Sequence, residues 1–541
     1  MAEGRGPRAA AADAGVDLVI VGAGFAGMAM LHAARGQGLR ARVFEAGAEV
    51  GGTWYWNRYP GARCDIESLE YSYQFSESLQ QQWHWTERFA AQPEILRYAI
   101  HVADRFGLRR DIAFSTRVLS ARFDETDGAW LVGTDDGQAT RARFLVMATG
   151  CLSSTHLPAI AGRETFAGES LHTGAWPHGP VDFTGRRVAV IGTGSSAVQS
   201  IPLIAEQASA LIVFQRTATW SIPARNRPVD PAYEAQVKAD YAGFRRRNDL
   251  MQAGFGANQP RNDRSVLDAS PAERDAVFAA FWARGGLGFG ATFNDLMLGE
   301  EANGYATAFL RARIREIVRD PAVAELLCPR QPVGCKRICI DSGYYETFNR
   351  DNVSLVDVSA TPIERITPRG PVVAGREYPV DAIVYATGFD AMTGALLKID
   401  IRGRDGVSLR SRWEAGPTTY LGLSIAGFPN LFTISGPGSP SVLTNMLVSI
   451  EQHVNWIADC LAWMRVHGRT RIEADPDAER AWGAHVNAVA DRTLYPRCNS
   501  WYLGANVDGK PRVFMPLIGF PAYVEKCNAV ARGGYTGFAT R

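Results

Sequence analysis

Apolar and small residues follow the same order in two distant parts of the chain. In the first part, an apolar run at residues 17–21 leads into the glycine turn Gly22-Ala-Gly24-Phe-Ala-Gly27. A periodic apolar stretch to about Gly36 and a second apolar run at 42–45 follow. Short apolar runs are typical of buried strands, and longer periodic stretches are typical of helices. The order strand, glycine turn, helix and strand predicts one βαβ unit.

The second part repeats this order about 170 residues later. The apolar run at 187–191 precedes Gly192-Thr-Gly194-Ser195-Ser196-Ala197, a helical pattern at 195–206 and another apolar run at 210–215. Strands that alternate with helices predict parallel sheets covered by helices on both faces. We therefore expect an α/β fold with two Rossmann-like dinucleotide-binding domains.

Two further apolar runs end in the same three residues. Residues 144–150 end in Ala-Thr-Gly150, and residues 382–388 end in Ala-Thr-Gly388. A glycine at such a strand end lets the backbone pass close to a bound dinucleotide. We interpret the two ends as crossings between the domains, near Cys151 and near Phe389.

The segment at 220–330 contains more polar residues than the two βαβ regions. Its pattern is helical and is interrupted at Gly285-Gly286, so we predict a helical insertion inside the second domain. The triple arginine Arg245-Arg246-Arg247 is expected to be a solvated face.

The residue that follows each second strand predicts which dinucleotide binds. Glu45 lies 18 residues after Gly27, where a carboxylate accepts hydrogen bonds from ribose hydroxyls and repels a 2′-phosphate. That position alone leaves FAD and NAD open. Arg216 and Thr217 hold the matching place after the second turn, where a guanidinium binds a 2′-phosphate. Together they predict FAD in the first site and NADPH in the second, with Gly192, Gly194, Ser195 and Ser196 at the second turn.

Composition narrows the possible functions. A net charge of +1 over 541 residues gives no reason to expect nucleic-acid binding. The eight cysteines include no Cys-x-x-Cys pair, so we expect no metal site and read the cysteines as reduced, mostly buried thiols. The Ala- and Gly-rich start has no signal-peptide core, and no membrane span is expected. We therefore predict a cytoplasmic protein without an obligate protein partner.

The segment between the two turns carries the most specific motif. Phe166, Gly168, His172, Trp176 and Pro177 form the pattern F-x-G-x-x-x-H-x-x-x-W-P. Two dinucleotide turns joined by this pattern resemble the type I Baeyer–Villiger monooxygenases, in particular their phenylacetone and steroid monooxygenase branch. The similarity extends from about residue 16 to residue 537. The resemblance implies an FAD- and NADPH-dependent oxygenase that converts ketones to esters or lactones through an anionic C4a-peroxyflavin and a tetrahedral adduct.

The resemblance also assigns roles to individual residues. It implies that Arg337 holds a positive charge at the flavin, that Asp65 orients this arginine, and that Lys336 binds the NADP phosphate. Other matched positions contact the cofactors, namely Thr53, Trp54, Tyr71, Val118, Met446 and Trp501. Leu152, Leu443 and Met446 match positions that line a substrate pocket. This implies O2 and an apolar small-molecule ketone as substrates, and the ketone is aryl-aliphatic, cyclic, or a bulky terpenoid or steroid. His172 receives a conformational role in the linker, because the reaction needs no base there.

The domain limits follow from these assignments. We expect a disordered tail at 1–15 and FAD-binding segments at 16–151 and 389–541, the latter with C-terminal active-site loops. The NADP-binding segments are 152–219, which includes the linker at 166–177, and 331–388, with the insertion at 220–330 between them. The sequence departs from the family at Cys151, where the related branch has a larger polar residue, and near Gly519, where one glycine of a pair is missing.

Three other functions compete with this interpretation. A flavin-dependent oxygenase of sulfur or nitrogen atoms uses the same scaffold and is the main alternative. A disulfide reductase needs a cysteine pair near the Gly51-Gly-Thr segment, where only Cys64 is present. A non-catalytic nucleotide sensor does not require Arg337 or Asp65.

Overall fold

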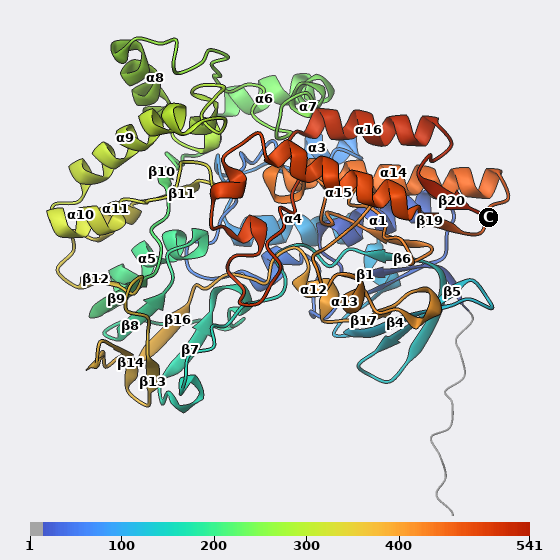
Figure 1. Cartoon of the computed structure of the whole chain (residues 1–541), viewed down its shortest axis with the longest axis horizontal. Helices are drawn as coiled ribbons and strands as arrows, with labels where there is room; N and C mark the ends of the chain where they lie inside the picture. The colour runs from blue at the N-terminus through green and yellow to red at the C-terminus, as the bar shows by residue number, and fades with distance from the viewer. Residues whose placement is uncertain (1–14) are drawn as a thin grey trace, which may run out of the picture.

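The computed structural model describes residues 15–541, so the predicted tail lies outside the described residues except for Gly15. The described chain forms two large sheets that lie side by side, with layers of helices around them (Figure 1). Within this part of the chain, no helix is both long and apolar enough to cross a membrane.

The first sheet contains eight strands. Its order is β17-β4-β5-β6-β1-β2-β3, and β18 pairs with the end of β6. The strands are β1 (Val16–Val21), β2 (Ala41–Phe44), β3 (Ile112–Ala113), β4 (Val118–Asp124), β5 (Ala129–Thr134), β6 (Ala139–Met147), β17 (Asp400–Arg402) and β18 (Leu431–Thr433). The pairs β4–β5 and β5–β6 are antiparallel, so this sheet is mixed rather than wholly parallel.

The apolar runs found in the sequence form the centre of this sheet. Leu18, Val19 and Ile20 of β1 are fully buried between β6 and β2. A buried aliphatic side chain of this size stabilises the fold by about 1.5–3 kcal/mol. The helix α1 (Phe25–Gly36) follows at once and packs on α14 (Met446–Val466). The predicted βαβ unit is therefore present, with strand boundaries one residue from those expected.

The second sheet contains five parallel strands in the order β12-β9-β8-β16-β7. They are β7 (Glu169–His172), β8 (Arg187–Ile191), β9 (Ala210–Gln215), β12 (Val353–Asp357) and β16 (Ala382–Tyr385). The helix α5 (Ser195–Gln207) connects β8 to β9 as predicted. A small antiparallel sheet of β13 (Arg365–Thr367), β14 (Gly370–Val373) and β15 (Arg376–Glu377) lies on the chain between β12 and β16.

Helices dominate the chain between β9 and the return to the second sheet. They extend across the top and down the left side of Figure 1. They are α6 (Pro231–Ala239), α7 (Tyr241–Asp249), α8 (Pro271–Arg284), α9 (Glu300–Ile317) and α10 (Pro321–Leu327), and α11 (Tyr344–Thr347) follows. Two short strands, β10 (Ser221–Pro223) and β11 (Cys339–Asp341), precede and follow these five helices in the sequence and pair with each other in parallel. The predicted domain limits stay predictions.

The triple arginine of α7 is not a uniformly solvated face. Arg246 and Arg247 are exposed, but Arg245 is only 4% exposed. Its guanidinium donates to the Glu70 carbonyl oxygen at 2.8 Å and to Gln80 Oε1 at 3.1 Å, and it lies over the Tyr241 ring. The prediction of a solvated face was wrong for Arg245, because its side chain packs against a loop distant in sequence and donates to a backbone carbonyl there.

The rest of the chain returns to the first sheet. Its elements are α12 (Gly394–Leu397), α13 (Leu409–Arg412), α14, α15 (Pro476–Ala490), α16 (Phe520–Arg532), β19 (Ile472–Ala474) and β20 (Phe538–Thr540). The N-terminal elements α2 (Thr53–Trp56), α3 (Glu77–Gln82) and α4 (Gln92–Arg105) pack with them. We call the first sheet with these helices the first body, and the second sheet with α5 the second body. One continuous apolar core joins α1, α4, α14, α15 and α16.

The two chain crossings between the sheets lie next to each other. Thr155 and Phe389 form an antiparallel bridge. On either side of it, His156 N–H donates to the Gly388 carbonyl at 3.0 Å and Asp390 N–H donates to the Ser154 carbonyl at 2.8 Å. The chain therefore leaves the first body and returns to it through one hydrogen-bonded pair of strands.

Candidate functional site

Two glycines of the first turn are required by close contacts with the surrounding backbone. Gly22 has φ +103°, and a Cβ there would lie 2.6 Å from the Ala148 carbonyl oxygen. A Cβ on Gly27 would overlap the Gly22 carbonyl oxygen, so this glycine allows α1 to pack on β1. No side chain caps the start of α1 at Gly24. The helix N-terminus therefore keeps the backbone N–H groups that bind an anion such as a pyrophosphate.

Glu45 follows β2 and lies beside this turn. Its carboxylate accepts hydrogen bonds from Ala23 N–H and from Gly47 N–H, each at 2.7 Å. Burial raises the pKa of Glu45, although the two N–H groups oppose that shift. Each carboxylate oxygen keeps a lone pair for a ribose hydroxyl. The turn and Glu45 together fit the adenosine end of FAD.

The second turn repeats these features in the other body. Gly192 has φ +109°, and a Cβ there would lie 2.5 Å from the Ala386 carbonyl oxygen. No side chain caps α5 at Gly194, and the first helical residue, Ser195, is exposed. Ser196 Oγ lies 3.0 Å from Thr173 Oγ1 of the linker. The start of α5 is therefore also open to an anion.

Two cations accompany the second turn without a carboxylate partner. Arg216 and Thr217 are exposed at the end of β9, and Thr193 Oγ1 donates to the Thr217 carbonyl at 2.8 Å. Burial lowers the pKa of Lys336, and the nearby charge of Arg216 lowers it further. Within residues 15–541 neither cation takes part in an ion pair. Two like charges held together without a counterion fit the 2′-phosphate of NADP.

Arg337 and Asp65 form an ion pair that joins the two bodies. Arg337 Nε donates to Asp65 Oδ2 at 2.6 Å, and Nη2 donates to Oδ1 at 3.0 Å. Burial by itself lowers the pKa of Arg337, but the charge and hydrogen bond of Asp65, together with Tyr502 and Cys64, raise the pKa overall. The guanidinium therefore stays charged at any working pH. The bidentate geometry fixes the plane of the guanidinium as well as its position.

Three further groups hold Arg337, and the sequence did not single them out. Nη1 donates to the Val442 carbonyl at 2.9 Å, and the backbone N–H donates to Tyr502 Oη at 3.0 Å. The guanidinium carbon lies 6.0 Å from the centre of the Phe255 ring. These groups come from three regions of the chain far from Arg337 in sequence, so no local pattern could reveal them. Tyr502 follows the predicted Trp501 directly, which is the nearest available signal.

The aromatic residues predicted around the cofactors form part of the first body. Trp54 Nε1 donates to Tyr71 Oη at 3.0 Å, and the two rings meet edge to face. Burial raises the pKa of Tyr71, and Asp65 and Arg337 also act on its charge, which places Tyr71 near the ion pair. Trp501 packs edge to face on Tyr502. Thr53 is exposed at the start of α2, and Val118 is buried at the start of β4. Their cofactor contacts stay predictions.

The three residues predicted to line the substrate pocket are all apolar and half-buried. Leu152, Leu443 and Met446 pack against the large core of the first body. Leu443 follows Val442, whose carbonyl accepts from Arg337, so it lies beside the ion pair in the chain. Cys151 is buried, and burial raises the pKa of its thiol to about 11. The thiol is therefore neutral, and the pocket role of all these residues stays a prediction.

The linker motif lies at the paired crossings. His172 Nδ1 accepts from Gly174 N–H at 2.9 Å, so its proton is on Nε2, which faces the His156 carbonyl at 3.3 Å. Burial lowers the pKa of His172, which keeps the ring neutral. A Cβ on Gly174 would lie 2.5 Å from the Phe389 ring, and Gly168 is equally close to the Phe166 ring. Trp176 is buried against Phe183. These contacts support a conformational rather than a chemical role.

The cysteine expectation needs a correction. Cys335 and Cys498 form a disulfide with Cα atoms 5.6 Å apart, and the other six cysteines are free and buried. The two residues are 163 positions apart, so no close cysteine spacing in the sequence indicates this pair. The bond joins the residue before Lys336-Arg337 to the loop that carries Trp501 and Tyr502.

Comparisons with known proteins agree with this geometry. The model of the flavin-binding monooxygenase-like family matches residues 16–237. A Baeyer–Villiger monooxygenase from Pseudooceanicola batsensis is 43% identical, and the match covers 96% of this chain and 95% of the relative. A cyclohexanone 1,2-monooxygenase from Acinetobacter sp. is 38% identical, with 96% of each chain covered. A solved steroid monooxygenase bound to NADP is 52% identical, with a TM-score of 0.92 and coverage of 97% of this chain and 99% of that one. The chain therefore belongs to the Baeyer–Villiger family of flavin-dependent monooxygenases.

Proposed function

We propose that this protein is an NADPH- and O2-dependent flavin monooxygenase that converts apolar ketones to esters or lactones. The ion pair between Arg337 and Asp65 carries the proposal. It holds a permanent cation where the body with the first open turn meets the body with the second, and one of these turns fits FAD while the other fits NADP. The flavin-binding family model and the NADP-bound steroid monooxygenase support these cofactors.

The chemistry needs a cation that does not lose its charge. When bound, the reduced flavin supplies the activated oxygen that attacks the carbonyl carbon of the ketone. Negative charge then develops on the ketone oxygen, and a fixed guanidinium stabilises that charge without reorganising. Asp65 holds Arg337 by two parallel hydrogen bonds, and the Val442 carbonyl fixes a third direction. The arginine is therefore preorganised before the substrate arrives.

The surrounding residues support an apolar substrate and a dry site. Leu152, Leu443 and Met446 offer no hydrogen-bonding side chains. Trp54, Tyr71 and Trp501 are expected to add aromatic surface around the cofactors. Exclusion of water strengthens the electrostatic effect of the guanidinium and limits side reactions. An apolar ketone fits this set better than a charged or strongly polar one.

Product analysis tests the proposal. The purified, yellow holoprotein is mixed with NADPH and either phenylacetone or cyclohexanone in air, and the products are identified by mass spectrometry. We expect one oxygen atom to be added, giving an ester or a lactone, and 18O2 to supply that atom. A sulfide added in competition measures the alternative, heteroatom oxygenation. NADPH consumption that yields sulfoxide but no ester from any ketone contradicts the proposal.

A further inference from the structure

Gln199 connects the NADP-binding helix to the loop that carries Asp65. It lies on α5, one turn after Ser195, at which the helix begins. Its side chain extends across to the other body and contacts the loop at 59–65. The hydrogen bonds that it makes there have no role in the chemistry described above.

The contacts fix the orientation of the Gln199 amide. A backbone carbonyl can only accept, so the amide Nε2 must face the Arg63 carbonyl oxygen, which it meets at 3.1 Å. The amide Oε1 then accepts from the Tyr59 hydroxyl at 2.8 Å. Burial raises the pKa of Tyr59, so its hydroxyl keeps the proton that it donates. Donor and acceptor are therefore matched on both sides.

The loop also fits closely against α5 through Gly61. Gly61 has φ +82°, and a Cβ there would lie 2.3 Å from the Gln199 carbonyl oxygen. Only a residue without a side chain allows this approach, because the atom in the way belongs to the helix backbone. We define Tyr59, Gly61, Arg63 and Gln199 as the interdomain latch.

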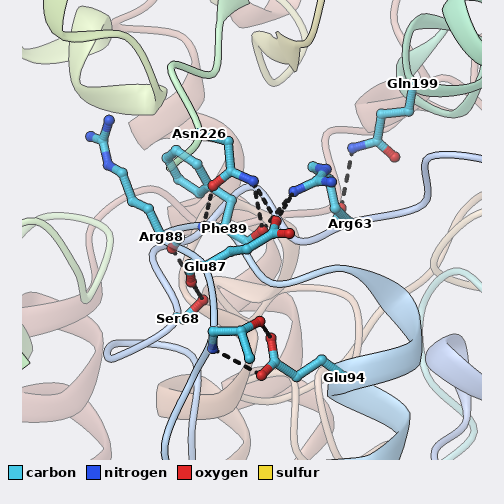
Figure 2. A network of polar contacts seen from close by, with 9 residues as sticks. Arg63, Ser68, Glu87, Arg88, Phe89, Glu94, Gln199 and Asn226 are labelled. Carbon is cyan, nitrogen blue, oxygen red and sulfur yellow. Dashed lines mark hydrogen bonds and ion pairs between the residues drawn. The ribbon is translucent and has the colours of Figure 1, made fainter. Parts of the chain in front are cut away.

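A polar network supports the loop from its other side. The Arg63 guanidinium donates to Glu87 Oε2 at 2.7 Å and to the Phe89 carbonyl oxygen at 2.8 Å (Figure 2). Asn226, at the start of the insertion, donates to Glu87 at 2.5 Å and accepts from Phe89 N–H at 2.9 Å. Arg63 therefore holds the loop at two points, with its side chain in this network and its carbonyl on Gln199.

The latch is only two residues from the catalytic ion pair. Asp65 follows Arg63 and Cys64, and Cys64 N–H donates to the Ala90 carbonyl at 3.0 Å. Arg337 approaches Asp65 from the body that contains α5, because β11 follows Arg337 directly and contacts α5. The two bodies thus meet at two neighbouring places, Gln199 on Arg63 and Arg337 on Asp65.

We propose that Gln199 is a positioning residue. It fixes the position of α5 relative to the loop that carries Asp65, and it thereby holds Asp65 in place for Arg337. The role rests on the proposed function, since it acts through the catalytic ion pair. A shift of α5 pulls on the Arg63 carbonyl and moves Asp65 with it. The Gln199 side chain therefore links the helix at which the NADP phosphates are expected to bind to the loop that orients the guanidinium.

The Gln199→Met variant tests this role. Methionine keeps the length and volume of the side chain but removes both hydrogen bonds. In the holoprotein we expect hydrogen exchange at the Ala62 and Cys64 amides to be about tenfold faster, the size expected from the loss of one to two neutral hydrogen bonds. We expect kcat for ester formation to fall by a similar factor, with KM for NADPH and the rate of flavin reduction within twofold of the wild type. More hydrogen peroxide is released per NADPH.

Two comparisons separate positioning from a structural defect. Glu206→Gln, on the exposed face of the same helix, is the matched control and is expected to leave exchange and kcat unchanged. In an Asp65→Asn background, Gln199→Met is expected to cost almost nothing further in kcat, because the latch acts through Asp65.

The outcomes are distinct. Unchanged exchange at residues 62–64 in Gln199→Met overturns the latch, and so does a full additional loss of kcat in the Asp65→Asn background. If the wild type forms no ester from any ketone, the proposed function fails, and the exchange comparison still decides whether Gln199 holds the loop.

Discussion

Replacement of Arg337 separates the effect of its charge from the effect of its geometry. The guanidinium donates three hydrogen bonds, at 2.6 Å and 3.0 Å to Asp65 and at 2.9 Å to the Val442 carbonyl. Arg337→Lys keeps one positive charge but cannot form the parallel pair with Asp65. The loss of one hydrogen bond to a charged group costs about 1.5–3 kcal/mol, which corresponds to roughly 10- to 150-fold in rate.

Arg337→Ala removes the charge as well. Loss of one preorganised oxyanion donor costs about 2.7–4 kcal/mol, so we expect ester formation to fall by about 10²–10³-fold. Asp65 loses its partner, but its side chain is 27% exposed, so water solvates much of the remaining charge. We therefore expect the fold to survive, with a smaller loss of stability than the roughly 3–5 kcal/mol seen for fully buried pairs.

The assay follows flavin reduction and ester formation separately in the same preparations. Anaerobic stopped-flow absorbance gives the rate at which NADPH reduces the flavin, and gas chromatography gives the ester formed per NADPH consumed. Flavin content and the thermal midpoint show whether each variant is folded. Ester formation by fully flavin-loaded Arg337→Ala at a rate within tenfold of the wild type contradicts a catalytic role for this guanidinium.

Three other perturbations probe separate features. Arg216→Gln removes one of the two cations beside the second turn. We expect KM for NADPH to rise about 10- to 100-fold while KM for NADH stays the same. An equal rise in KM for both cofactors argues against 2′-phosphate binding by Arg216. Reduction of the Cys335–Cys498 disulfide opens a loop of 163 residues and is expected to lower the free energy of unfolding by roughly 2–5 kcal/mol; equal thermal midpoints with and without dithiothreitol contradict this. Burial raises the pKa of Glu451 from 4.5 to about 7, so between these values the native state holds a proton that the unfolded state has released. The wild type therefore loses stability as the pH rises through this window. The free energy of unfolding of Glu451→Gln is expected to rise relative to that of the wild type by up to about 3 kcal/mol between pH 4.5 and pH 7. A stability difference between the two proteins that does not vary with pH excludes the pKa shift.

The sequence predicts those parts of the structure that depend on local order. The βαβ units, the open helix starts and the positions of Glu45 and Arg216 follow from residues within about 30 positions of one another. The apolar runs are buried on both faces of the sheets, so their pattern identifies strands with little ambiguity. Gly22 and Gly192 are required by the carbonyl oxygens of Ala148 and Ala386, which follow the neighbouring strands β6 and β16, and the glycine spacing already indicates that need.

Contacts between segments that are far apart in the sequence could not be predicted from local patterns. Tyr502 and Val442 approach Arg337 from positions 165 and 105 residues away, and no periodicity connects such residues. The burial of Arg245 depends on a carbonyl 175 residues away. The family resemblance named Asp65 and Arg337 together, but only the structure shows the two parallel hydrogen bonds between them.

The bridge between Thr155 and Phe389 has a consequence for the history of the polypeptide. A segment whose two ends are hydrogen-bonded neighbours can be spliced into a host chain, or removed from it, without pulling the host apart. Strand β18, which comes after the segment, pairs with β6, which comes before it, so the host sheet is completed across the splice. The NADP-binding part thus has the form of a cassette inserted into the flavin-binding chain.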